Sequence, residues 1–158
     1  MSSLEYQSTL PKKRMGAGAL FFNEFNELLL LEPSYKSTWE IPGGVVEKNE
    51  SPRACCEREV FEELGLRWTA DHLLCVDYNA TTDIRLESLM FIFNGGVLTS
   101  QEIGSIILQQ EEIRSYRFFQ KDKLPDNLSL TLKRRILAAW QNREMPNNLG
   151  KIYLENGS

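Results

Sequence analysis

The chain has 158 residues, of which 42% are hydrophobic and 25% are charged, the balance of an ordinary globular protein with one core. Its formal net charge is −4 and its pI is near 5.2. This charge argues against a protein that binds extended nucleic acid, because such proteins normally present a basic face. A small phosphorylated ligand remains possible, since a bound metal ion can supply positive charge.

Three cysteines, Cys55, Cys56 and Cys75, are an odd number and have no C-x-x-C spacing. Neither a disulfide framework nor a zinc site is expected, so we interpret them as reduced thiols in the core of a cytoplasmic protein. The single histidine, His72, cannot build a histidine-rich metal site. Residues 1–10 are polar, contain no hydrophobic signal segment and are expected to form a flexible tail. No apolar run is long enough to cross a membrane.

The first half of the chain predicts a hairpin followed by a helix. Two apolar stretches, 15–22 and 27–31, flank a polar turn, which is typical of a β-hairpin. A loop then leads through Trp39-Glu40-Ile41 to the breaker run Pro42-Gly43-Gly44. Ser51-Pro52 supplies an N-cap hydroxyl and a proline for the first helical position, and Gly65 supplies a C-terminal stop. These signals predict a helix over residues 53–64.

The second half predicts strands at 73–78, 86–93 and 113–119, a turn at Asn94-Gly95-Gly96, a helix at 130–141 and a short edge strand at 151–154. No repeat or linker divides the chain, so a single domain is expected over residues 1–158. The alternation of strands with two helices predicts an α+β fold in which a mixed sheet packs between helices.

The helix at 53–64 carries an acidic cluster. Positions around an α-helix advance by about 100° per residue, which places Glu59, Glu62 and Glu63 within an arc of about 100°. Apolar side chains, Phe61 among them, are expected on the opposite side. Like charges at this spacing repel each other, so the cluster is either a solvated face or a binding site for a hard cation such as Mg²⁺, which oxygen ligands suit.

The surrounding sequence favours the metal site. Residues 44–66, GVVEKNESPRACCEREVFEELGL, fit the pattern G-x5-E-x7-R-E-U-x-E-E-x-G-U, with U apolar, at every defined position. A chance match in a chain of this length is below roughly 10⁻⁶. The pattern is the Nudix box, and the chain resembles the Nudix hydrolase superfamily. The preceding run 39–44 is similar to that family's approach to its box.

This resemblance implies a Nudix-type α/β/α sandwich that hydrolyses a diphosphate linkage in a nucleotide-like substrate. Glu59, Glu62 and Glu63 match the metal-binding glutamates of the family, and the carbonyl of Gly43 or Gly44 commonly adds a ligand. The expected cofactor is Mg²⁺, with Mn²⁺ as a possible substitute. The resemblance also implies positioning roles for two further residues: Glu50 steadies the loop, and Arg58 orients the catalytic Glu59. Carboxylate-held cations would stabilise charge that develops on the diphosphate and lower the pKa of a bound water.

Many Nudix enzymes use a further glutamate, from a loop before a late strand, as general base or additional ligand. Glu111 and Glu112 precede the strand at 113–119 and are the natural candidates for this role, with Glu102 as a third; each could equally be a solvated loop charge. Further residues could contact substrate or serve the fold alone: Tyr35, Lys36, Trp39 and Arg85.

The resemblance is compatible with three functions. The favoured one is a catalytic pyrophosphohydrolase acting on a small nucleoside diphosphate derivative or nucleoside triphosphate. The second is a non-catalytic module that senses a nucleotide or binds a protein, although such modules usually lose box residues and this box is complete. The third is an isomerase of isoprenoid diphosphates, whose cysteine and acid pattern Cys55 and Cys56 do not supply. Neither the substrate nor the oligomeric state can be read from the sequence; a homodimer would be common among relatives.

Overall fold

The computed structural model describes residues 1–145 and 150–158. Strands β1 (Arg14–Phe22) and β2 (Leu28–Pro33) form the predicted hairpin, with Phe22 opposite Leu28. Asn23 stabilises its turn, because its side-chain oxygen accepts hydrogen bonds from the backbone N–H groups of Phe25, at 3.0 Å, and Glu27, at 2.9 Å. The predicted hairpin is therefore confirmed.

Seven strands of the described residues make one mixed sheet. The other five are β3 (Gly43–Val45), β4 (Leu73–Asn79), β5 (Ser88–Val97), β6 (Ile113–Phe119) and β7 (Tyr153–Glu155). The order is β6-β2-β1-β5-β4-β7, and β3 pairs with β1 beyond the end of β2. Strand β1 is parallel to β5 and antiparallel to β2 and β3. The strand expected at 151–154 corresponds to β7, which is parallel to β4.

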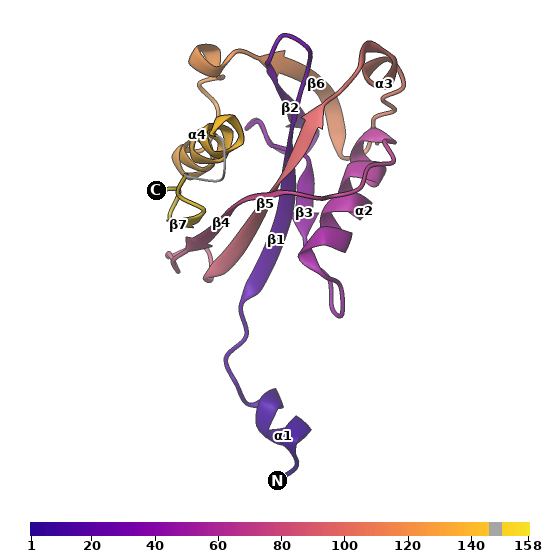
Figure 1. Ribbon diagram of the computed structural model, residues 1–158. Coiled ribbons are helices and arrows are strands. Elements are labelled where there is room, and N and C mark those ends of the chain that lie inside the picture. The colour runs from indigo at the N-terminus through magenta and orange to yellow at the C-terminus, as the bar shows by residue number, and fades with distance from the viewer. Residues whose placement is uncertain (146–149) are drawn as a thin grey trace.

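Two long helices cover opposite faces of this sheet, α2 (Pro52–Leu64) and α4 (Leu130–Glu144) (Figure 1). Each strand contributes side chains to both faces of the sheet, because successive side chains point to opposite faces. On β1, Ala17, Ala19 and Phe21 belong to the core beneath α2, whereas Leu20 and Phe22 belong to the core beneath α4. This arrangement confirms the expected α+β fold, an α/β/α sandwich.

The ends of α2 follow the sequence signals. The Ser51 hydroxyl oxygen accepts from the N–H of Ala54 at 3.0 Å, and Pro52 occupies the first turn. Gly65 ends the helix in the left-handed conformation with a φ of 70°. A side chain at this φ would be strained, so the glycine fixes where the helix stops.

The expected turn at Asn94-Gly95-Gly96 is wrong, since these residues lie inside β5. Leu20 pairs with Asn94 and Phe21 pairs with Gly96, so Gly95 is an extra residue and the feature is a β-bulge. A Cβ on Gly95 would lie 2.5 Å from the Phe21 ring, which explains the glycine. The run Pro42-Gly43-Gly44, which the sequence indicates as a break in secondary structure, also contributes to a strand, since Gly43 and Gly44 lie in β3.

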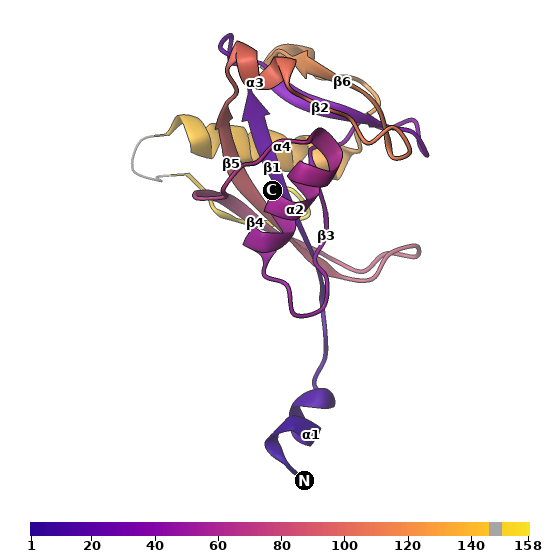
Figure 2. The ribbon, with the colours of Figure 1, turned by 90° about the vertical axis from the view of Figure 1, so that its right-hand side faces the viewer.

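Two short helices were not predicted, α1 (Ser3–Ser8) and α3 (Ser100–Gly104). Helix α1 lies within the expected tail, projects away from the sheet and is fully exposed (Figures 1 and 2). Each has a capping box, in which Ser2 or Thr99 exchanges hydrogen bonds with a glutamate three residues later. Among the residues described, no helix is long and apolar enough to span a membrane.

Candidate active site

Arg58 is the centre of a cluster of box carboxylates. Its Nε and Nη2 donate to the two oxygens of Glu50, at 2.8 and 3.0 Å. Its Nη1 donates to Glu59 at 2.8 Å and to Glu62 at 3.2 Å. One guanidinium therefore fixes three carboxylates that would otherwise repel each other. These contacts, with burial opposing them, raise the pKa of Arg58, so it stays charged.

Glu50 joins the loop before α2 to the helix. Besides Arg58, its Oε1 accepts from the backbone N–H of Glu47 at 3.1 Å. The hydrogen bonds from Arg58 are the largest cause that lowers the pKa of Glu50, to about 2. Glu50 is thus ionised at neutral pH and holds this loop against Arg58, in keeping with a supporting position.

Glu63 is the buried member of the cluster, with 7% of the residue exposed. Its Oε1 accepts from the Gly43 N–H at 2.8 Å. Burial raises the pKa of Glu63 to about 8, the Gly43 hydrogen bond opposes this, and the charges of Glu59 and Glu112 add to it. Burial is also the main cause that raises the pKa of Glu59, which Arg58 opposes.

The expectation of acids on one side of α2 and apolar residues opposite needs correction. Glu63 is buried, whereas the side chain of Glu62 is 48% exposed. Phe61 is 45% exposed and lies beneath the Arg67 guanidinium, 4.8 Å from the ring centroid. The acidic arc therefore adjoins the buried face, which brings two of its carboxylates against strand β3.

Two glycines bring the β3 backbone against these acids. A Cβ on Gly44 would lie 2.5 Å from the carboxylate carbon of Glu59. Gly43 has a φ of 150°, and a Cβ there would lie 2.3 Å from the Ala17 carbonyl oxygen. The Cys55 thiol donates to the Gly44 carbonyl at a sulfur–oxygen distance of 3.7 Å. Only glycine allows the carboxylates and the strand to approach this closely.

These residues fit a divalent cation by donor type. Three carboxylates and two nearby carbonyls are hard oxygen donors, and neighbouring carboxylates add to the burial that raises the pKa values of Glu59 and Glu63. One oxygen each of Glu59, Glu62 and Glu63 accepts no hydrogen bond from the described residues. Among those same residues, no three acidic, cysteine or histidine side chains are already grouped to hold an ion.

Of the candidates for the general base, Glu112 acts electrostatically on the carboxylates of this cluster. The charge of Glu112 raises the pKa of both Glu59 and Glu63. The Glu112 carbonyl accepts from the Ser34 N–H at 2.8 Å, which fixes the backbone at this point. Both glutamates are exposed. Glu102 caps α3 instead, where it accepts from the Thr99 N–H at 3.0 Å.

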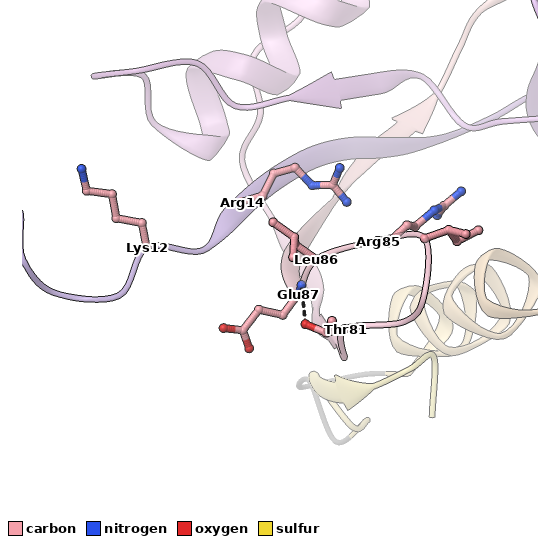
Figure 3. A pocket seen from close by; sticks show the side chains of 7 residues that line it. Lys12, Arg14, Thr81, Arg85, Leu86 and Glu87 are labelled. Carbon is pink, nitrogen blue, oxygen red and sulfur yellow. Dashed lines mark hydrogen bonds between the residues drawn. The ribbon is translucent and has the colours of Figure 1, made fainter.

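The remaining candidates separate into core and surface. Trp39 is buried and packs edge-on against Phe119, with ring centroids 5.2 Å apart, so it belongs to the core. Tyr35 is 73% exposed, and Lys36 pairs with Glu40. Arg85 lies in the loop between β4 and β5 and lines a cavity with Lys12 and Arg14 (Figure 3). Sequence reasoning missed Lys12 and Arg14, because nothing in their local pattern connects them with Arg85.

Comparison with known proteins establishes the family. The model of the NUDIX domain matches residues 12–141, so the chain belongs to the NUDIX domain family. A MutT-like protein of Streptomyces ambofaciens is 34% identical over 84 residues, which cover 53% of this chain and 54% of that protein. The chain thus matches about half the length of this relative.

Solved structures share the fold. The MutT protein of Methanosarcina mazei Go1 superposes with a TM-score of 0.71 at 23% identity, covering 87% of this chain and all of that one (100%). A UDP-X diphosphatase superposes with a TM-score of 0.75 at 24% identity, covering 98% of this chain and 75% of that one. The resemblance read from the box is therefore confirmed for both family and fold.

Proposed function

We propose that this chain is a metal-dependent pyrophosphohydrolase that cleaves a diphosphate linkage in a nucleoside diphosphate derivative or a nucleoside triphosphate. The observation that carries the proposal is the Arg58 cluster. Arg58 holds Glu59 and Glu62, while Glu59 and Glu63 lie against the glycines of β3. Membership of the NUDIX family supports the same activity.

In this proposal Glu59, Glu62 and Glu63 hold Mg²⁺, for which Mn²⁺ can substitute, and a carbonyl of Gly43 or Gly44 contributes a further oxygen. Bound Mg²⁺ supplies positive charge against the diphosphate oxygens and lowers the pKa of a coordinated water. Arg58 keeps Glu59 ionised and fixes its rotamer. The absence of a side chain at Gly44 lets the backbone of β3 lie directly against the Glu59 carboxylate.

Glu112 is proposed to accept the proton of the attacking water. A general base must lie within hydrogen-bond reach of the proton that it removes, or reach it through one water. The electrostatic effect of Glu112 on Glu59 and Glu63 supports this choice over Glu111. Its exposed side chain is free to reorient when substrate covers the site.

The test is turnover with isotopic labelling. Purified protein with Mg²⁺ is given nucleoside triphosphates, nucleotide sugars, ADP-ribose and dinucleoside polyphosphates in ¹⁸O-labelled water. We expect at least one compound to be hydrolysed and label to appear on a phosphate product, because water attacks phosphorus. The variant Glu59→Gln is the inactive control. Label at carbon would refute the phosphoryl mechanism.

The alternative is a module that senses a nucleotide or binds a protein without turnover. The same panel separates the two functions, since a sensor would be stabilised by a nucleotide that it does not cleave. The complete box favours catalysis, because a sensor has no need for Arg58 to organise three carboxylates.

The setting of this activity is also part of the proposal. Residues 1–158 would act as a single domain on a small substrate, without a membrane or extended nucleic acid. Three buried free cysteines favour a reducing compartment such as the cytoplasm. A homodimer, if formed, would be detected by light scattering of the purified protein.

A further inference from the structure

An ion pair outside the box, between Lys36 and Glu40, is held against strand β2. The Lys36 ammonium contacts the Glu40 carboxylate four residues later, and both side chains are 35% exposed. Glu40 forms an isolated antiparallel bridge with Leu31. Its N–H donates to the Leu31 carbonyl at 2.9 Å, and its carbonyl accepts from the Leu31 N–H at 2.7 Å. The backbone at Glu40 is therefore fixed relative to the sheet.

This bridge places the ion pair on the α2 side of the sheet. Residues directly opposite each other in an antiparallel pair point to the same face. Leu31 belongs to the core beneath α2, so Glu40 also points to that side. Its neighbours Trp39 and Ile41 belong to the core beneath α4, as alternation along an extended segment requires. The Lys36 ammonium, which contacts Glu40, thus lies on the side of the sheet that α2 and its carboxylates cover.

The ion pair is also close to Glu63. Gly43, whose N–H donates to Glu63 at 2.8 Å, follows Glu40 by three residues. An extended chain rises by about 3.3 Å per residue, so the Cα atoms of Glu40 and Gly43 are at most roughly 10 Å apart. The charge of Glu40 is accordingly one of the causes that raise the pKa of Glu63. Lysine carries its ammonium on a flexible four-carbon stem, so Lys36 can turn from Glu40 towards an anion held at the carboxylate cluster.

The backbone of the Lys36 loop is fixed, but its side chain is not. The Ser34 N–H donates to the Glu112 carbonyl at 2.8 Å, which ties this loop to the segment that carries the proposed base. Among the residues that the structure describes, the Lys36 ammonium contacts only Glu40 and the exposed Tyr35 ring, 5.6 Å from its centroid. Ion pairs of this exposure contribute little to stability, so a stronger anion can replace Glu40 as the partner of Lys36.

Arg58 has no N–H group left for a substrate. A guanidinium carries five N–H groups. Nε and Nη2 donate to Glu50, and Nη1 donates to Glu59 and Glu62. The second N–H of Nη2 donates to the Val45 carbonyl at 3.4 Å. A diphosphate that enters among these carboxylates therefore needs a further cation besides the metal, because like charges repel strongly at short range.

We propose that Lys36 binds a non-bridging oxygen of the substrate's diphosphate, exchanging its contact with Glu40 for one with the phosphate. This inference rests on the proposed function and refines it, because it adds a substrate-binding residue from outside the box. An ammonium binds phosphate oxygens as a point charge and does not require one fixed direction of approach. Lys36 therefore contributes to binding of the diphosphate itself, whatever group is attached to it.

Imidodiphosphate tests this contact without turnover, because nitrogen replaces its bridging oxygen and it carries no other group. Isothermal titration calorimetry in Mg²⁺ measures its dissociation constant. Lys36→Gln should weaken binding by about tenfold, the loss expected for one charge-assisted contact, whereas Lys36→Arg keeps the charge and should bind more tightly than Lys36→Gln. Lys133→Gln, exposed on α4 at the opposite face of the sheet, is the matched control and should bind as wild type does. Equal binding by wild type and Lys36→Gln would overturn the assignment.

Glu40→Gln separates substrate binding from a purely structural role of the ion pair. Lys36→Gln and Glu40→Gln both break the pair, but only the first removes the cation. Glu40→Gln should therefore bind imidodiphosphate at least as tightly as wild type, because Lys36 no longer has a competing partner. Equal weakening in both variants would mean that the pair only supports the loop, and the proposal would fail.

These measurements also separate the inference from the proposed function. If Lys36→Gln weakens imidodiphosphate binding but wild type hydrolyses no compound of the panel, the catalytic proposal fails and the Lys36 assignment stands. If wild type hydrolyses a compound but Lys36→Gln binds imidodiphosphate as wild type does, the catalytic proposal stands and the Lys36 assignment fails. A wild-type protein that does not bind imidodiphosphate would likewise overturn the Lys36 assignment, while the panel decides on catalysis independently.

Discussion

Arg58 and Glu50 form a two-point contact, in which both nitrogens of one guanidinium edge donate to both oxygens of one carboxylate, at 2.8 and 3.0 Å. The remaining nitrogen, Nη1, is thereby aimed at Glu59 and Glu62. The pair thereby links the position of the loop before α2 to the orientation of the Glu59 carboxylate.

Replacing Arg58 by lysine should therefore reduce activity although the charge is kept. An ammonium group lacks the planar fork and cannot hold Glu50 on two points while reaching Glu59. We expect kcat to fall by about 10- to 100-fold, because a misplaced carboxylate costs alignment. Steady-state kinetics measures this, with Arg53→Lys on the exposed side of the same helix as control. Wild-type kcat in Arg58→Lys would show that one positive charge suffices.

Glu62 allows the metal role to be separated from folding, because its side chain is half-exposed. In Glu62→Gln, kcat should fall by at least about 100-fold, since a hard anionic ligand is lost. The melting temperature should stay constant or rise, because like charges no longer repel along the helix. Glu24→Gln, in the β1–β2 turn, is the control. Activity that persists in this variant, or in excess EDTA, would remove Glu62 from the metal site.

Glu63 makes the stability of the metal-free protein depend on pH. Its pKa is about 8 in the folded state against 4.5 as the ordinary value, so the folded state holds the proton more tightly. Stability should therefore fall as pH rises from 4.5 to 8, by at most about 1.4 kcal/mol per pH unit.

Urea denaturation in EDTA at several pH values within this window measures the slope. Glu63→Gln should lose it, because the amide stays neutral and can still accept from the Gly43 N–H. At the alkaline end of this pH range, where the Glu63 carboxylate is charged, added Mg²⁺ should increase the free energy of unfolding of the wild-type protein. A wild-type protein whose stability does not change with pH would contradict the assignment.

The two neighbouring loop glutamates supply their own control. If Glu112 is the base, Glu112→Gln should lower kcat by about 100-fold, within the usual range for general-base catalysis, while Glu111→Gln stays near wild type. Both side chains are exposed, so neither variant should alter the melting temperature. A larger kcat effect in Glu111→Gln would exchange their roles, and no effect in either would leave Glu59 as the base.

The sequence predicted the fold where local chemistry determines local structure. Ser51, Pro52 and Gly65 bounded α2 correctly because caps act within one helical turn. The glycines at 95 and 96 indicated a turn but form a bulge, since pairing with β1 decides between the two outcomes and that partner is some 75 residues away. Helical spacing predicts Phe61 on the apolar side of α2, but its ring is partly exposed and lies under Arg67, a contact that spacing alone does not indicate.

The candidate site was predictable as a set of residues but not as an arrangement. The box spacing singles out Arg58 and the three glutamates proposed to bind metal, yet the burial of Glu63 depends on β3, where the sequence predicts only a break in secondary structure. The position of Lys36 on the α2 side of the sheet was not predictable, because it depends on the pairing of Glu40 with Leu31.

The central position of β1 has a consequence for how this protein can vary. The strand contributes alternate side chains to both cores, and its glycines also set the approach of β3 to the carboxylates. Inserting or deleting one residue in β1 would exchange the two sets of side chains between the two cores. Length changes should therefore be excluded from β1 during evolution and be confined to exposed loops between the strands.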